Sequence, residues 1–133
     1  MKLAGMAAVA VACFAVGWSV AAPVAPTAAD QTLGMAYMFA AVRSNGALVR
    51  GSGVTGAAGF QSSAYEVTFE RSVLNCSHSA TVAGTDDFLI PLAGFALTAG
   101  RTVNPNTVFV QTTNAAGNAP ENRSFHLVVF CPK

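Results

Sequence analysis

The sequence Ala64-Tyr-Glu-Val-Thr-Phe-Glu-Arg71 decides the fold class, because its apolar and polar residues alternate one by one. The alternation sorts the side chains onto two faces, with Tyr65, Val67 and Phe69 on one and Glu66, Thr68 and Glu70 on the other. A period of two is typical of a β-strand with one face in a core and the other in water. We therefore predict a half-buried strand over residues 64–71.

Two later segments also have the composition of strands. Residues 107–112 are rich in β-branched and aromatic side chains, and residues 124–131 are apolar on both faces, as in a central strand of a sandwich. Between them, residues 114–120 consist of turn-forming and small side chains. Weaker strands are expected at 80–82, 88–90 and 95–97.

The dipeptide Asn45-Gly46 separates two short apolar runs and predicts a hairpin turn. The second arm, 47–50, leads into the glycine-rich residues 51–53, where we expect a bulge or a sharp bend. The first arm, 35–42, is ambiguous. Its Ala and Met content suits a helix, whereas the turn that follows favours a strand.

Turn signals recur along the whole chain, and no segment has a sustained helical period. This pattern predicts an all-β fold, an antiparallel β-sandwich of about seven or eight short strands. A partly closed barrel is the nearest alternative. With 133 residues in all, the chain has room for one such domain, over residues 35–133.

The first 21 residues have the parts of a secretory signal peptide. Lys2 supplies a positive charge, residues 3–20 are almost uninterruptedly apolar, and Ser19 and Ala21 are the small residues that a cleavage site requires. We expect cleavage after Ala21, a flexible lead-in over residues 22–34, and a domain that is secreted or held at the cell surface.

Two alternatives to cleavage remain at this point. The apolar run is close to the ~17–25 residues of a spanning helix, so an uncleaved segment would be a membrane anchor. Lipid attachment at Cys13 is the other alternative, because the residues before it faintly resemble a lipobox. Membrane contact is expected only through this segment.

Loss of the signal peptide removes Cys13 and leaves Cys76 and Cys131 as the only intramolecular pair. An even cysteine count in a small exported domain predicts a disulfide. In the chain-entropy model a loop of this span stabilises by roughly 4 kcal/mol. The alternative is a reactive thiol, which would need a helix N-terminus or nearby cations, whereas Cys131 ends an apolar strand-like run.

Four segments of the sequence, taken in this order, carry a resemblance to other proteins. They are Leu48-Val-Arg-Gly-Ser-Gly-Val54, Tyr65-Glu-Val-Thr-Phe-Glu-Arg71 leading to Asn75-Cys76, Asn106-Thr-Val-Phe-Val110, and Arg123-Ser-Phe-His-Leu-Val-Val-Phe-Cys131. As a set they resemble a group of small secreted bacterial β-sandwich proteins of uncharacterised function, from about residue 36 onward. The resemblance implies export and pairing of the two cysteines, and it implies no reaction, substrate or ligand. One departure is Ser77-His78-Ser79, where smaller or aromatic residues would be expected after the first cysteine.

Neither histidine belongs to a recognisable site. His126 is expected to be a hydrogen-bonded structural residue, and His78 to lie at a strand start. A zinc site would need three or four ligands. A Ser-His-Asp triad could be composed from a serine, His78 and Asp86, but nearly any chain offers these three residue types, so we do not predict one. Asp86 and Asp87 suit a solvated turn better than a calcium loop, which needs spaced carboxylates.

The paired carboxylates Glu66 and Glu70 do not predict a glycosidase. Four residues apart on a strand, they would lie more than about 10 Å from each other. We expect no aromatic cluster for sugar stacking near them, because the only tryptophan, Trp18, lies in the signal peptide. The glycine-rich residues 51–56 lack the lysine of a phosphate loop. We therefore expect no catalytic residue, metal or cofactor.

Charge excludes a further class of partner. Only 10% of the residues are charged, against ~25% in an average domain. Removing Lys2 from the seven basic residues leaves six, which balance the six acids. Because these charges are scattered, nucleic-acid binding is not expected.

The first functional hypothesis is a secreted or cell-surface β-sandwich, not an enzyme, with a structural or binding role. Its candidate partners are a cell-envelope or extracellular protein or a glycan, and its outward residues Val128 and Phe130 could support an oligomer. The alternative is a small secreted hydrolase, or an inhibitor of an extracellular enzyme acting through loop 98–106 or loop 114–122.

Overall fold

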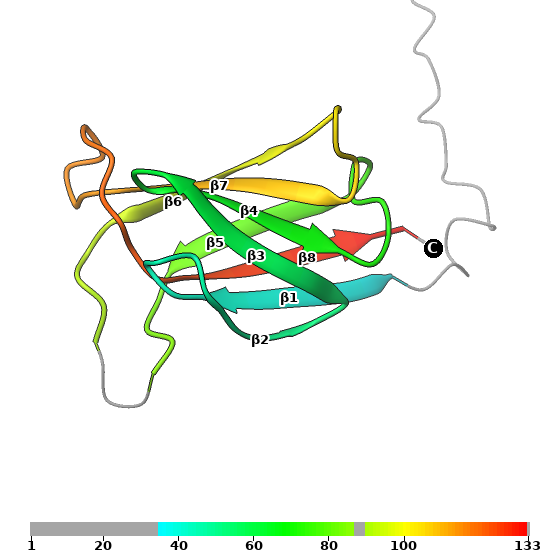
Figure 1. Ribbon diagram of the computed structural model, residues 1–133, viewed down its shortest axis with the longest axis horizontal. Coiled ribbons are helices and arrows are strands. Elements are labelled where there is room, and N and C mark those ends of the chain that lie inside the picture. Colours follow the sequence, from blue (N-terminus) through cyan, green and yellow to red (C-terminus); the bar gives the residue numbers. More distant parts are fainter. Residues whose placement is uncertain (1–34, 87–89, 133) are drawn as a thin grey trace, which may run out of the picture.

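The computed structural model describes residues 35–86 and 90–132, and these form two packed antiparallel sheets of four strands each (Figure 1). The strands are β1 (Ala36–Val42), β2 (Leu48–Ser52), β3 (Val54–Gln61), β4 (Ala64–Phe69), β5 (Ser77–Val82), β6 (Phe95–Gly100), β7 (Thr107–Thr113) and β8 (Phe125–Cys131). The strand order is β2-β1-β8-β5 in one sheet, here the β1 sheet, and β3-β4-β7-β6 in the other, the β4 sheet. The predicted sandwich is confirmed.

Some expectations lie outside the described residues or need correction. The signal peptide 1–21 and the lead-in 22–34 are outside them, as are residues 88 and 89 of the weak strand expected at 88–90. Ile90, which is described, is not in a strand. The described residues contain no helix, and so none with the length and apolar character that a membrane span requires.

The core follows from the alternation in the sequence. In β4, Tyr65, Val67 and Phe69 are buried between the sheets, while the outward residues Glu66 and Thr68 are only half-buried. The strand ends at Phe69, so Glu70 lies just beyond it rather than on its outer face. Complete burial of an apolar side chain of this size contributes about 1.5–3 kcal/mol, so the inward rows account for most of the packing energy.

β8 is central in its sheet, between β1 and β5, as its apolar character on both faces predicted. Phe125, Leu127 and Val129 are fully buried on its inner face. The ambiguous segment 35–42 is strand β1, which hydrogen-bonds to both β2 and β8. Tertiary pairing therefore overrides the helix propensity of its Ala and Met residues.

Strand β3 was not predicted, and it includes part of the glycine-rich residues 51–56. The chain passes from the β1 sheet to the β4 sheet at Gly53, which has a positive φ of 68° and packs closely against Met38. The expected bend is therefore present. Beyond it the chain continues as a strand, with register shifts against β4 at Val54/Gly56 and at Gly59/Gln61.

The two long edges of the sandwich are closed in different ways. Gly53 joins β2 to β3 along one edge. Along the other, the hydroxyl of Thr98 in β6 donates to the carbonyl oxygen of His78 in β5, at 3.4 Å. No ladder joins β5 to β6 within the part of the chain that the structure describes, so the strands form two sheets rather than a closed barrel.

The connections gather at two ends of the sandwich, seen left and right in Figure 1. The loop end, on the left, holds the short connections 43–47 and 62–63 and the two longest ones, 83–86 with 90–94 and 114–124. The disulfide end, on the right, holds Gly53, residues 70–76, residues 101–106 and the chain end at Pro132.

Candidate functional site

Cys76 and Cys131 form a disulfide, as the cysteine count predicted. Ser77 pairs with Phe130 across β5 and β8, so the cysteines lie opposite each other one position further along, with Cα atoms 4.4 Å apart. That separation is typical of residues facing each other on neighbouring antiparallel strands. Cys131 is fully buried and Cys76 is partly buried, so the bridge belongs to the edge of the core.

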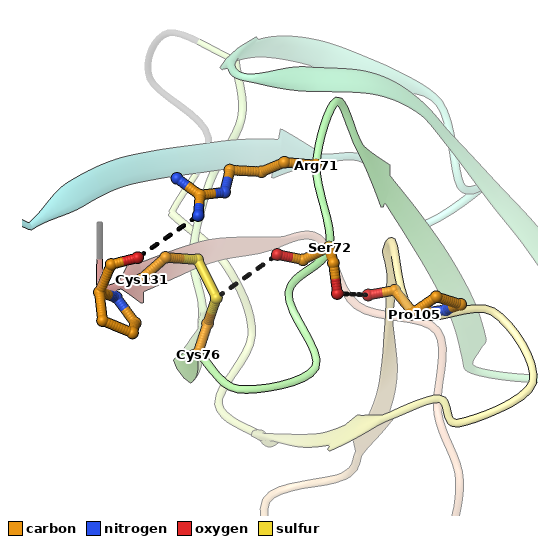
Figure 2. Close-up of a disulfide and its surroundings, with 6 residues drawn as sticks. Arg71, Ser72, Cys76, Pro105 and Cys131 are labelled. Atoms are coloured by element: carbon orange, nitrogen blue, oxygen red, sulfur yellow. Dashed lines mark hydrogen bonds between the residues drawn. A yellow bond between two sulfur atoms is a disulfide. The ribbon is translucent and has the colours of Figure 1, made fainter.

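The segment after β4 is fastened around this bridge (Figure 2). The Sγ of Cys76 lies 3.8 Å from the carbonyl oxygen of Ser72, and the guanidinium of Arg71 donates to the carbonyl oxygen of Pro132 at 3.3 Å. The hydroxyl of Ser72 in turn reaches the carbonyl oxygen of Pro105 at 3.5 Å. Residues 71 and 72 therefore lie between the disulfide, the chain end at Pro132 and the loop 101–106.

The loop 101–106 is attached to the same segment and presents one apolar side chain. The carbonyl oxygen of Pro105 accepts from the backbone N–H of Val73 at 2.8 Å, and that of Asn106 accepts from Phe69 at 2.8 Å. Val103 at its tip is 86% exposed. The inhibitor-type loop expected at 98–106 is therefore shorter, because residues 98–100 belong to β6.

At the opposite end of the sandwich, a hydrogen bond connects the two sheets. The phenolic hydroxyl of Tyr65 in β4 donates to the carbonyl oxygen of Ser44 in the β1–β2 turn, at 2.9 Å. The N–H of Ser44 donates to the hydroxyl of Ser124, at 3.2 Å. Burial raises the pKa of the Tyr65 phenol, which keeps this hydroxyl a donor at neutral pH.

A second hydrogen bond fixes the neighbouring β3–β4 turn. The side-chain Oδ1 of Asn122, in the β7–β8 loop, accepts from the backbone N–H of Ser63 at 2.5 Å. Ser63 is buried and has a positive φ of 61°, an uncommon conformation for a residue with a Cβ. The Asn122 side chain therefore holds a tight turn in place across the two sheets.

Two cavities flank this hydrogen-bonded wall, and Ser44 and Asn122 line both. The first, which we call the polar cavity, has a volume of about 330 Å³. It is lined by Ser44, Asn45, Gly59, Phe60, Gln61, Ser62, Tyr65 and Asn122. The second has a volume of about 270 Å³ and includes the exposed apolar side chains of Ile90 and Leu92 together with Arg123.

Phe60 links the polar cavity to the outer face of the β4 sheet. Its ring packs against Phe109 of β7, with centroids 5.8 Å apart, and the guanidinium of Arg101 lies 5.9 Å from the Phe109 centroid. Arg101 also pairs with the carboxylate of Glu66 at 2.9 Å. The expectation that no aromatic residues gather near Glu66 is therefore wrong, because β3 and β7 bring two phenylalanines there.

The outer face of the β1 sheet has its own aromatic cluster. Tyr37 packs on Phe39 and on Phe130, with ring centroids 5.9 and 5.5 Å apart. Tyr37 is exposed and Phe130 is 37% exposed, while Val128 is half-buried beside Phe39. The outward positions named from the sequence therefore share one uncharged patch.

The two histidines occupy separate places. His126 is half-buried in β8 and its Nε2 lies 3.1 Å from the carbonyl oxygen of Gly84, as expected of a structural histidine. His78 lies at the start of β5, on the side that faces Gly100 of β6. Asp86 follows the far end of β5, so the strand separates it from His78 and no triad is assembled from them.

Asp86 is instead part of an exposed ion pair with Arg43 of the β1–β2 turn. The hydrogen bond to Arg43 lowers the pKa of the Asp86 carboxyl below its ordinary value. Asp87 lies outside the described residues. Over residues 35–86 and 90–132, no three His, Cys, Asp or Glu side chains are close enough together to hold a metal ion.

Sequence reasoning missed the polar cavity because its residues come from three parts of the chain that are far apart in sequence: the β1–β2 turn, the end of β3 with its turn into β4, and the β7–β8 loop. The signal that was available is the occurrence of Asn, Gln and Ser residues between the predicted strands, at Ser44-Asn45, Gln61-Ser62 and Asn122. Comparisons of the chain with protein-family models, with curated proteins and with solved structures gave no match.

Proposed function

We propose that this chain is an exported binding protein, not an enzyme, that engages its partner through the loop end of the sandwich. The observation that carries this proposal is the polar cavity, which two hydrogen bonds between distant segments hold open: Tyr65 to Ser44, and Ser63 to Asn122. A site organised before binding loses less entropy when a partner arrives. Binding residues carried on loops above a rigid scaffold are common in β-sandwich proteins.

Export is part of the same proposal. The signal-like first 21 residues and the closed Cys76–Cys131 bridge support it, since small disulfide-linked domains belong to oxidising compartments. The bridge stabilises the end opposite the polar cavity. The scaffold is therefore held covalently at one end and presents its longest loops at the other (Figure 1).

The alternative of a hydrolase receives less support from the same geometry. His78 and Asp86 lie at opposite ends of β5, and the Glu66 carboxylate is engaged by Arg101. General acid–base catalysis needs a proton-transfer group within reach of the reacting atom in a site that takes substrate. The polar cavity is instead lined by hydroxyl, amide and phenol groups, which suit recognition.

A second candidate is an inhibitor that presents Val103 to an extracellular enzyme. The observation that favours it is the combination of an 86% exposed apolar side chain with a loop held by the Pro105 and Asn106 carbonyl oxygens. A rigid loop with a single protruding apolar anchor is the kind of surface that fills a specificity pocket.

One experiment separates the two candidates. A photo-crosslinking benzophenone amino acid replaces Ser62 at the loop end in one variant and Val103 in another, and both are irradiated in the medium of the producing cells. Adducts that form only from position 62 support the loop-end proposal, and mass spectrometry identifies the partner. Adducts only from position 103 support the inhibitor, and adducts from neither position contradict both the inhibitor and a protein partner at the loop end.

A further inference from the structure

We propose that the loop end binds a neutral saccharide chain, with one sugar in the polar cavity and its neighbour against the ring of Phe60. This inference rests on the proposed loop-end binding and adds to it the chemical class of the ligand. It also extends the site beyond the cavity, onto the outer face of the β4 sheet.

The first argument is the absence of charge from the cavity wall. All eight residues that line the polar cavity are uncharged. Among the described charged groups at this end, Arg43 pairs with Asp86, Arg123 pairs with Glu121 at 2.8 Å, and Arg50 donates to the carbonyl oxygen of Thr85 at 3.1 Å. A phosphate, carboxylate or ammonium ligand would lose hydration here without gaining an ionic partner. The ligand that the cavity favours is therefore polar and neutral.

The second argument is the kind of polar group that the wall presents. Serine hydroxyls and primary amides can each donate and accept, as sugar hydroxyls do. Two of the amides are already oriented, because the Oδ1 of Asn45 accepts from the N–H of Ala47 at 3.0 Å and the Oδ1 of Asn122 accepts from the N–H of Ser63. Their NH₂ groups are thereby left as donors of defined direction. Gln61 and Ser62 add further donors and acceptors at the rim.

The third argument is the aromatic ring beside these polar groups. Phe60 is 48% exposed, yet it is not loose, because its ring packs on Phe109, which in turn lies under the Arg101 guanidinium. A pyranose ring has one face of C–H groups as well as its hydroxyls. A fixed apolar ring next to amides and hydroxyls matches both kinds of surface at once.

The surface beside the polar cavity also indicates the direction in which a bound saccharide chain would run. From the polar cavity the surface continues over Phe60 and Phe109 to the Glu66–Arg101 pair, on one face of the β4 sheet. Such a strip suits an extended chain rather than a single sugar. The Glu66 carboxylate and the Arg101 guanidinium lie 2.9 Å apart and neutralise each other's charge. This pair is therefore polar and compatible with a neutral ligand.

The test is a titration of the purified exported protein, followed by ¹H–¹⁵N NMR, with four neutral hexasaccharides: cellohexaose, xylohexaose, maltohexaose and chitohexaose. We expect at least one to shift the amide signals of residues 44–45 and 59–62 with saturation. A galacturonic acid hexamer is the charged counterpart and is expected to bind more weakly than the neutral chain that binds best.

Phe60→Ala is expected to weaken that binding about tenfold, the effect of losing one aromatic contact. The matched control is Phe95→Ala. Phe95 is similarly exposed, at 55%, and also lies at the loop end of the β4 sheet, but on β6 at the edge opposite β3. Gln61→Ala, at an exposed rim position, tests the amide contribution with little risk to folding.

Each outcome bears on the inference. Equal losses in Phe60→Ala and Phe95→Ala would contradict the assigned location, and tighter binding of the charged hexamer would contradict the neutral class. If none of the four neutral chains shifts any signal at millimolar concentration, the saccharide inference is wrong. Loop-end binding itself survives that result if the benzophenone at position 62 captures a protein, and fails with it if no adduct forms there.

Discussion

The phenolic hydroxyl of Tyr65 and the carbonyl oxygen of Ser44 join the two sheets of the sandwich by a 2.9 Å hydrogen bond. Tyr65 belongs to β4, whereas Ser44 lies in the turn between β1 and β2 of the other sheet. The tyrosine ring also packs on Phe125 of β8, with centroids 5.0 Å apart. A single side chain therefore contributes to the core and to the wall of the polar cavity.

Tyr65→Phe is expected to lower the free energy of unfolding by about 1 kcal/mol, because the ring still packs while the Ser44 carbonyl loses its partner. Urea denaturation followed by circular dichroism measures the change. Tyr37→Phe is the control, since Tyr37 is 55% exposed on the outer face of the β1 sheet. Equal effects of the two substitutions would show that the Tyr65 hydroxyl has no special role.

The same hydroxyl predicts a sensitivity to alkali. Burial raises the pKa of Tyr65 in the folded state, so the unfolded chain loses its proton first, near the ordinary tyrosine pKa of ~10. Stability from this group is complete below that pH and declines as the pH rises through the folded-state value. The wild-type unfolding midpoint should therefore fall more steeply above about pH 10 than that of Tyr65→Phe. Parallel profiles would contradict the assignment.

Two glycines, Gly46 in the β1–β2 turn and Gly56 near the start of β3, differ in what an added methyl group would meet. Gly46 has a φ of +87°, and a Cβ there would lie 2.2 Å from the backbone nitrogen of Gly59. Gly56 has open space, with nothing within 4 Å. Gly46→Ala should therefore destabilise by more than about 1 kcal/mol, whereas Gly56→Ala should stay within about 0.5 kcal/mol of the wild type. Thermal unfolding of the two variants side by side is the measurement, and similar midpoints would contradict the prediction.

Local patterns were sufficient for much of the fold. The Asn45-Gly46 turn and the alternation in β4 depend on neighbours in sequence, and both are present as predicted. β3 escaped because its glycines and alanines have weak strand propensity. It is a strand because β4 pairs along its length, for example Ala57 with Val67, and a single sequence does not show that pairing.

The candidate site was less accessible to sequence reasoning for the same reason. Phe60 lies on β3, so without that strand its ring could not be placed beside Phe109. Asn122 reaches Ser63 across 59 residues of chain, a contact that only the packing of the two sheets creates. The sequence supported only the hypothesis of a structural or binding role, and three-dimensional pairing was needed to propose where a partner would bind.

The Arg43–Asp86 pair predicts a small dependence of stability on acid pH. The pKa of Asp86 is lowered in the folded state, so its contribution is present above the unfolded aspartate pKa of ~3.9 and is lost as the pH falls through the folded value. Asp86→Asn should therefore unfold at a lower temperature than the wild type at neutral pH, and the gap should vanish in acid. Because the pair is exposed, high salt should also narrow the gap. A gap that persists in acid and in salt would contradict the ion-pair explanation.

The last prediction concerns the effect of the disulfide on the stability of the whole domain and on local hydrogen exchange. Replacing both Cys76 and Cys131 with Ala should cost about 2–5 kcal/mol of stability, measured by urea denaturation, because the unfolded chain is released from a closed loop.

Locally, the hydroxyl of Ser72 and the backbone N–H of Val73 donate to the carbonyl oxygen of Pro105, and the carbonyl oxygen of Val73 accepts from the backbone N–H of the bridged Cys76 at 3.1 Å. Amide hydrogen exchange in the double variant should therefore accelerate more at residues 70–76 and 101–106 than at residues 43–47, at the opposite end of the sandwich. If exchange instead rises uniformly, the bridge stabilises only the chain as a whole, and the rigid presentation of Val103 cannot be attributed to it.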